Sequence, residues 1–219
     1  MNDGDGFWGD ELKEREGTLR IMYNNVNGLK IGDFIKMKIN DKINKKNKKM
    51  LKGKRSSEKV TGILATLRNW NANILCLAET QCAWENHVCR NNVEQELRLI
   101  DGYAGMIGSS SCTACSDVYK PGGTLTVYDG NWSGRITRGI DTHKLGRWSY
   151  ITITGRNFTY LTIITAYRCC KGQNQSNTGM ASSYRQQETI LKARGRQISP
   201  QKAFIEDLKT LIKKNTRRT

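Results

Sequence analysis

The strongest constraint on this chain is a short, largely apolar segment, residues 72–78, that ends directly at Glu79. This length and composition are typical of a strand buried on both faces, because half-exposed strands alternate apolar and polar residues. Residues 19–25 are also densely apolar and end at Asn27-Gly28, which is a turn signal. We expect both segments to be buried strands.

A helical signal lies between these strands. Four apolar residues fall at i, i+3, i+4 and i+7 spacing: Val60, Ile63, Leu64 and Leu67. Gly62 weakens such a helix by up to about 1 kcal/mol relative to alanine without forbidding it. The order strand, helix, strand predicts a βαβ-like beginning and an α/β fold class.

The second half of the chain has the composition of an antiparallel meander, because β-branched and aromatic segments alternate with Gly, Asp, Ser and Asn clusters. The expected strands are residues 103–107, 123–128, 135–140, 148–154 and 158–167. Two helices should follow. Ser183 and Gln186 have capping-box spacing before a stop at Gly195, and a last helix is expected over Pro200–Lys214.

The net charge of +16 is concentrated in two segments. Residues 30–59 carry 12 Lys and Arg against three acids, and residues 208–219 carry five with no acid. Such clusters bind polyanions by releasing counterions, so the expected partner is a polyanion such as a nucleic acid. A solvated loop explains the first segment equally well, and residues 45–49 are also typical of a nuclear-import signal.

These patterns predict one domain. Residues 18–214 would form it, with a lysine-rich insertion at 30–58, a flexible leader at 1–17 and a basic tail at 215–219. The acidic start, the lack of a long apolar run and seven irregularly spaced cysteines predict an intracellular protein, with the nucleus as one destination. Cys112 and Cys115 have the spacing of half a zinc site, but we expect ordinary thiols.

Glu79 is the most informative acid, because it ends a strand that is otherwise apolar. A carboxylate in that position is a candidate Mg²⁺ ligand, and a solvent-facing or salt-bridged glutamate is the alternative. Asn25 and Asn27 end the first strand, so parallel pairing would bring them beside Glu79. Asn27 alone is better explained as a turn residue.

Four blocks in order resemble the endonuclease/exonuclease/phosphatase superfamily, closest in look to the endonuclease domains of non-LTR retrotransposons. They are Leu19-Arg-Ile-Met-Tyr-Asn-Asn-Val-Asn-Gly-Leu29, Asn73-Ile-Leu-Cys-Leu-Ala-Glu-Thr80, Gly122-Gly-Thr-Leu-Thr-Val-Tyr128 and Leu161-Thr-Ile-Ile-Thr-Ala-Tyr-Arg168. Asn27 and the Ala-Tyr-Arg ending of the last block favour the retrotransposon type.

The resemblance implies a four-layered α/β sandwich and hydrolysis of a phosphate ester, with Mg²⁺ or Mn²⁺ as cofactor. The leading expectation is the nicking of DNA, and the alternative substrates within the same superfamily are RNA, an abasic site and an inositol phosphate. Matched residue by residue, Glu79 becomes the metal-binding carboxylate and Asn25 an asparagine near the metal and the phosphate. Tyr167 becomes the tyrosine that donates a hydrogen bond to the scissile phosphate. A metal and such donors stabilise charge that develops on the phosphate.

The later motifs of this superfamily, Gly-Asp-x-Asn and Ser-Asp-His, do not occur in the sequence. The two histidines, His87 and His143, match neither, and His143 is expected to be a loop residue. We therefore expect an incomplete sandwich, the N-terminal portion of the fold, present as a truncated and inactive fragment. A C-terminal half or a reverse transcriptase domain would be its missing partner. The alternative is a noncatalytic, basic nucleic-acid-binding protein.

Overall fold

The computed structural model describes residues 18–29, 62–63, 70–98, 103–111, 120–171 and 182–216. The strands are β1 (Ile21–Asn25), β2 (Ile74–Ala78), β3 (Tyr103–Ser109), β4 (Thr124–Asp129), β5 (Ile136–Ile140), β6 (Trp148–Thr154) and β7 (Tyr160–Ala166). The longer helices are α3 (His87–Arg98), α4 (Ser183–Ala193) and α5 (Pro200–Thr216). Within these ranges, no helix has the length and apolar character needed to cross a membrane.

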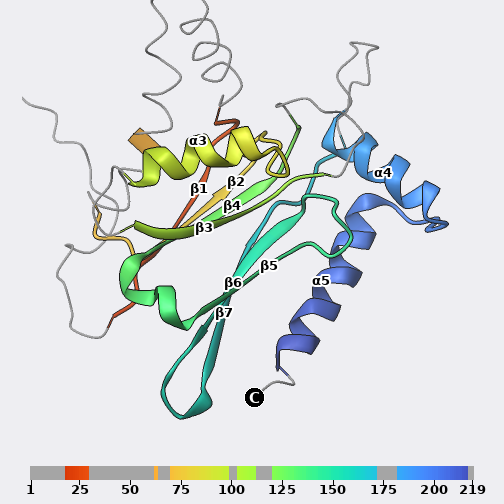
Figure 1. The fold of residues 1–219 in the computed structure, drawn as a ribbon. Coiled ribbons are helices and arrows are strands. Elements are labelled where there is room, and N and C mark those ends of the chain that lie inside the picture. Colours follow the sequence, from red (N-terminus) through yellow and green to blue (C-terminus); the bar gives the residue numbers. More distant parts are fainter. Residues whose placement is uncertain are drawn as a thin grey trace, which may run out of the picture.

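The first sheet has the strand order β1-β2-β4-β3 (Figure 1). β1 and β2 are parallel, as the strand, helix, strand pattern predicts, while β4 is antiparallel to both of its neighbours. Of the predicted helix between β1 and β2, only Gly62 and Ile63 are described, and both are helical. The lysine-rich insertion and the leader lie outside the described residues.

The second sheet contains β5, β6 and β7, paired antiparallel in sequence order. The five strands predicted in this half of the chain all form, but they do not make one meander. β3 and β4 instead join the first sheet, because β4 pairs with the distant strand β2. The chain is thus a mixed α/β structure with two sheets.

The two sheets pack face to face through alternate residues of their central strands. Ile74 and Cys76 of β2 share a buried cluster with Ile151 and Ile153 of β6. Hydroxyl groups continue this contact, since Oγ1 of Thr126 lies 2.7 Å from Oγ1 of Thr165 and 3.0 Å from Oγ of Ser149. Because these buried hydroxyl groups are hydrogen-bonded to each other, they avoid the free-energy penalty of a buried polar group without a partner.

β2 is buried along its whole length, as its composition predicts. The same expectation for β1 is wrong, since four of its five residues are exposed. β1 is an edge strand. Its residues Ile21 and Tyr23 lie on the face of the first sheet that packs against β6, because they are in register with Ile74 and Cys76. Their side chains are nevertheless 46% and 61% exposed. A strand can be apolar and still lie at an edge.

Helix α3 covers the opposite face of the first sheet (Figure 1). Its buried residues Cys89, Val93 and Leu97 are spaced four apart, which places them on one side of the helix. They pack with Leu75, Leu77 and other core residues of the sheet. Helix α3 is not predicted from the sequence, because its other residues are mostly polar.

Helices α4 and α5 follow β7. Helix α5 packs on the outer side of the second sheet, and α4 packs against α5 and against Leu145 in the loop before β6. The rings of Trp148 in β6 and Phe204 in α5 meet edge to face with centroids 5.6 Å apart. The cap of α4 is Ser182, not the predicted Ser183, and its side chain accepts a hydrogen bond from a backbone N–H of the first turn. Gly195 ends the helix as predicted, at φ +73°.

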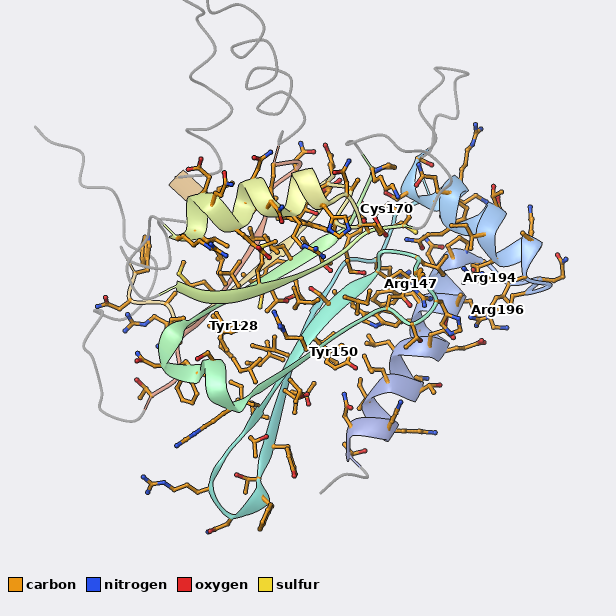
Figure 2. All side chains as sticks on the ribbon, viewed as in Figure 1. Tyr128, Arg147, Tyr150, Cys170, Arg194 and Arg196 are labelled. Carbon is orange, nitrogen blue, oxygen red and sulfur yellow. The ribbon has the colours of Figure 1, made fainter. Side chains whose placement is uncertain are left out.

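A buried ion network fixes α5 to the sheet. Arg147 donates to both carboxylate oxygens of Asp141 at 2.7 and 2.9 Å and to Asp207 of α5 at 2.8 Å. Arg196 adds a bidentate pair with Asp207 at 2.7 and 2.9 Å. Figure 2 shows Arg147 and Arg196 on the side of the molecule where α5 lies.

Candidate functional site

Glu79 and Asn25 lie at the carboxyl ends of two neighbouring parallel strands. Asn25 is in register with Ala78, the residue before Glu79. The ladder continues past the strand ends, because Val26 N–H donates to the Ala78 carbonyl at 3.1 Å and Gly28 N–H to the Glu79 carbonyl at 2.7 Å. The carboxyl edge of parallel strands is the usual place for ligands in α/β sheets.

The backbone of Glu79 is held in an uncommon conformation, with φ at +58°. Few residues other than glycine occupy this left-handed region, and those that do so are concentrated at functional sites. The next peptide is also fixed, since Thr80 N–H donates to the carbonyl of Gly123 at 3.2 Å. The direction of the Glu79 side chain is therefore set by backbone contacts on two sides.

Tyr167, which directly follows β7, meets Glu79 although 88 residues separate them. Its hydroxyl donates a hydrogen bond to Oε1 of Glu79 over 3.3 Å. Burial, followed by the charge of Glu79 and this hydrogen bond, raises the pKa of Tyr167 to about 12. The phenol thus keeps its proton at neutral pH and remains a hydrogen-bond donor.

The half-buried carboxylate of Glu79 forms no ion pair among the described residues, which argues against the salt-bridge alternative. The buried cation on the neighbouring loop, Lys120, instead donates to the Ser111 carbonyl at 2.8 Å and approaches Glu85 at 3.4 Å. Lys120 was not recognised from the sequence. Because Lys120 is engaged elsewhere, the half-buried carboxylate of Glu79 lies beside the Tyr167 phenol without an ion-pair partner among the described residues.

Asn25 has a local role that its position alone does not reveal. Its Oδ1 accepts a hydrogen bond from the N–H of Asn27 at 3.1 Å, and Asn27 has φ at +44°. Asn27 is therefore the turn residue that its Asn-Gly sequence indicates. Gln81, which the sequence analysis did not single out, donates to Oδ1 of Asn27 at 3.3 Å. No hydrogen bond is found between Asn25 and Glu79 or Tyr167.

The backbone of Gly122 lies directly against the ring of Tyr167. A Cβ atom at this residue would lie 3.1 Å from Cε1 of Tyr167 and 2.9 Å from Oγ of Ser183, and its φ is +79°. Both the space and the backbone conformation therefore require glycine. Gly122 lies in one of the four blocks that resemble the superfamily, but its sequence position alone indicates no role. The Gly-Gly pair before a strand was the available signal.

Glu79 and Asn25 offer oxygen ligands of the type that a hard divalent cation prefers, but they are only two ligands. Mg²⁺ accepts one or two carboxylates and completes its octahedron with water and phosphate oxygens. Glu79 supplies one carboxylate and Asn25 one amide oxygen. Over the described ranges, no group of three or more His, Cys, Asp or Glu side chains could hold a metal. The arrangement can therefore provide part of a metal–phosphate site.

The other candidate residues lie elsewhere or outside the described residues. His143 is a loop residue, as expected, with Nε2 lying 3.8 Å from Oδ2 of Asp207. A ring nitrogen of His87 in α3 lies 2.8 Å from the guanidinium of Arg90. Cys112 and Cys115 are outside the described residues.

No protein-family model matches this chain, and no curated protein matches it either.

Proposed function

We propose that this chain carries part of a Mg²⁺- or Mn²⁺-dependent phosphodiesterase site of the endonuclease/exonuclease/phosphatase type, with DNA as substrate and nicking as reaction. The observation that carries the proposal is the hydrogen bond between Tyr167 and Glu79 at the strand ends. Two residues matched to this superfamily from separate blocks of sequence lie in direct contact, and the third, Asn25, ends the adjacent strand.

The fold proposed with this function is the four-layered α/β sandwich. Support comes from the packing of α3 on one sheet, of α5 on the other, and of the sheets on each other. Two parallel strands at the start and an antiparallel hairpin that leads to Tyr167 agree with this arrangement.

In the proposed site, Glu79 and the amide oxygen of Asn25 would hold the cation. When bound, the cation would supply positive charge that stabilises the developing negative charge on the phosphate. Tyr167 keeps its proton on the hydroxyl oxygen, so it can donate to a phosphate oxygen without ionising. The left-handed backbone of Glu79 and the close contact of Gly122 with the tyrosine ring position both groups before any ligand arrives.

A single carboxylate is a small catalytic set, and the sequence holds neither later motif of the superfamily. We therefore propose that residues 1–219 do not hydrolyse DNA alone and that a further segment or partner domain supplies the missing acid and imidazole. The uncovered apolar side chains support this. Ile21, Tyr23 and Leu161 lie on the inter-sheet faces of β1 and β7 yet are 46%, 61% and 48% exposed.

Plasmid nicking tests this incompleteness. With Mg²⁺ or Mn²⁺ present, purified residues 1–219 should leave supercoiled plasmid intact. Robust nicking that disappears in Glu79→Ala would show that the site is complete, contrary to the proposal. Calorimetric titration with Mn²⁺ tests the site itself, since Glu79→Gln should weaken binding while Glu206→Gln, an exposed acid on α5, should not.

The second candidate is a noncatalytic, basic nucleic-acid-binding protein. Its support is the charge distribution, because three lysines of the basic C-terminal segment 208–219, Lys209, Lys213 and Lys214, are exposed on α5. Such binding weakens steeply with salt but does not depend on a divalent cation. DNA affinity that is the same with EDTA and in Glu79→Ala, together with no Mn²⁺ binding at Glu79, would favour this candidate.

A further inference from the structure

The turn between β6 and β7 presents an aromatic side chain to solvent. In this turn, residues Arg156–Phe158, the Phe158 side chain is 82% exposed, the most exposed of the large apolar residues described. In Figure 1 the β6–β7 hairpin extends away from the rest of the molecule. A single exposed apolar residue is ordinary on a protein surface, but the conformation of this one is not.

The backbone of the turn is strained at the aromatic residue. Asn157 and Phe158 have φ values of +55° and +56°. Asparagine tolerates this left-handed region, whereas for a bulky residue it is a genuine outlier. Three hydrogen bonds hold the turn: Gly155 N–H to the Thr159 carbonyl at 2.7 Å, and the N–H and hydroxyl of Thr159 to the Arg156 carbonyl at 3.2 and 2.8 Å. No burial of the ring offsets the strain, which points to a ligand for it.

The same turn borders a basic hollow of about 440 Å³. Its lining contains Arg135 and Arg156 and no acidic residue. Neither guanidinium forms an ion pair within the described parts of the chain. Two uncompensated arginines in a concave surface attract phosphate, which they can bind with two parallel hydrogen bonds.

The geometry points to a binding site for single-stranded nucleic acid at this turn, with an unpaired base stacked on Phe158 and backbone phosphate held by Arg135 and Arg156. Exposed aromatic rings beside basic grooves are the common means of binding single strands, whereas the bases of a duplex are already stacked. The site is separate from Glu79 and Tyr167. β7 runs seven residues from the turn toward Tyr167, a length of about 20 Å at about 3.3 Å per residue.

Fluorescence anisotropy with a short labelled oligothymidine and the full chain in EDTA tests this site. Phe158→Ala should weaken binding roughly 5- to 100-fold, the range found when a stacking ring is removed. Arg156→Ala should reduce the slope of log affinity against log salt by about 0.7, the contribution of one single-strand phosphate contact. Lys192→Ala, an exposed cation on α4, is the matched control and should leave affinity nearly unchanged.

Three further variants distinguish base stacking on the ring from apolar docking and from a purely conformational role of Phe158. Phe158→Tyr should retain affinity, whereas Phe158→Leu, which keeps an apolar surface without a ring, should lose it. Phe158→Gly should lose affinity but resist urea at least as well as wild type, because glycine adopts a positive φ without strain. Wild-type affinity in both Phe158→Ala and Arg156→Ala would overturn the proposal. So would equal affinity of Phe158→Leu and Phe158→Tyr, which would show that oligothymidine binding needs an apolar side chain but no aromatic ring.

The phosphodiesterase proposal can fail independently of this one. Binding in EDTA does not use the cation, and Glu79→Gln should bind oligothymidine as wild type does. High salt improves the measurement, because it weakens the background binding of the lysine-rich segments more than base stacking.

Discussion

The pKa of Tyr167 provides a quantitative test of its contact with Glu79. Glu79→Gln removes the carboxylate charge and keeps a hydrogen-bond acceptor of the same size, while burial of the phenol is unchanged. Across the 3.3 Å between the two oxygens, repulsion between a phenolate and a carboxylate is about 1.3 kcal/mol in a water-like dielectric, or about one pKa unit. The water-like limit applies because both side chains are only half-buried.

We therefore expect the pKa of Tyr167 to fall from about 12 by roughly one unit in Glu79→Gln and to stay above the ordinary tyrosine value of about 10, since burial is its largest cause. Carbon-13 NMR of the tyrosine ζ carbons measures it, with Tyr167→Phe identifying the signal. Glu206→Gln serves as the charge-matched control. An unchanged pKa in Glu79→Gln, or a wild-type value near 10, would refute the contact.

Three other variants test the surrounding structure. Gly122→Ala should lower the free energy of unfolding in urea by about 1 kcal/mol or more through its positive φ and close contacts, while Gly134→Ala, with open space around it, should not. Burial raises the pKa of Asp207, but hydrogen bonds from Arg196 and Arg147 outweigh burial, so the net pKa is lowered. The Asp207 carboxylate therefore stabilises the fold above about pH 4, and this stabilisation is lost at lower pH. Asp207→Asn should therefore lose stability at neutral pH and show a flatter acid dependence by urea unfolding. Leu97→Ala should cost about 2 to 5 kcal/mol in the same assay, against little for the exposed Gln95→Ala.

Local patterns predicted the elements whose signals are contained in their own residues. The continuous apolar run of β2 and the alternation of β6 are examples, because burial on both faces or one face leaves a direct mark on composition. Helix α3 was not predicted, because its only apolar residues at regular spacing are Cys89, Val93 and Leu97 and most of its other residues are polar. The spacing of four was present and could have identified it.

Sheet membership could not be predicted in the same way. The pairing of β4 with β2 brings residues about 50 positions apart together, and nothing within β4 distinguishes it from β6. For the site, the end of an apolar strand indicated Glu79, and superfamily resemblance supplied Tyr167. Gln81 and Lys120 became visible only through tertiary contacts, since their roles depend on loops that meet after folding.

Paramagnetic NMR with Mn²⁺ tests the central claim, that Glu79 and Asn25 form part of a divalent-cation site beside Tyr167. Substoichiometric Mn²⁺ should broaden the signals of Asn25, Thr80 and Tyr167 first, and Glu79→Gln should remove this effect while Glu206→Gln leaves it intact. Broadening confined to other parts of the molecule, or unchanged at Tyr167 in Glu79→Gln, would contradict the assignment.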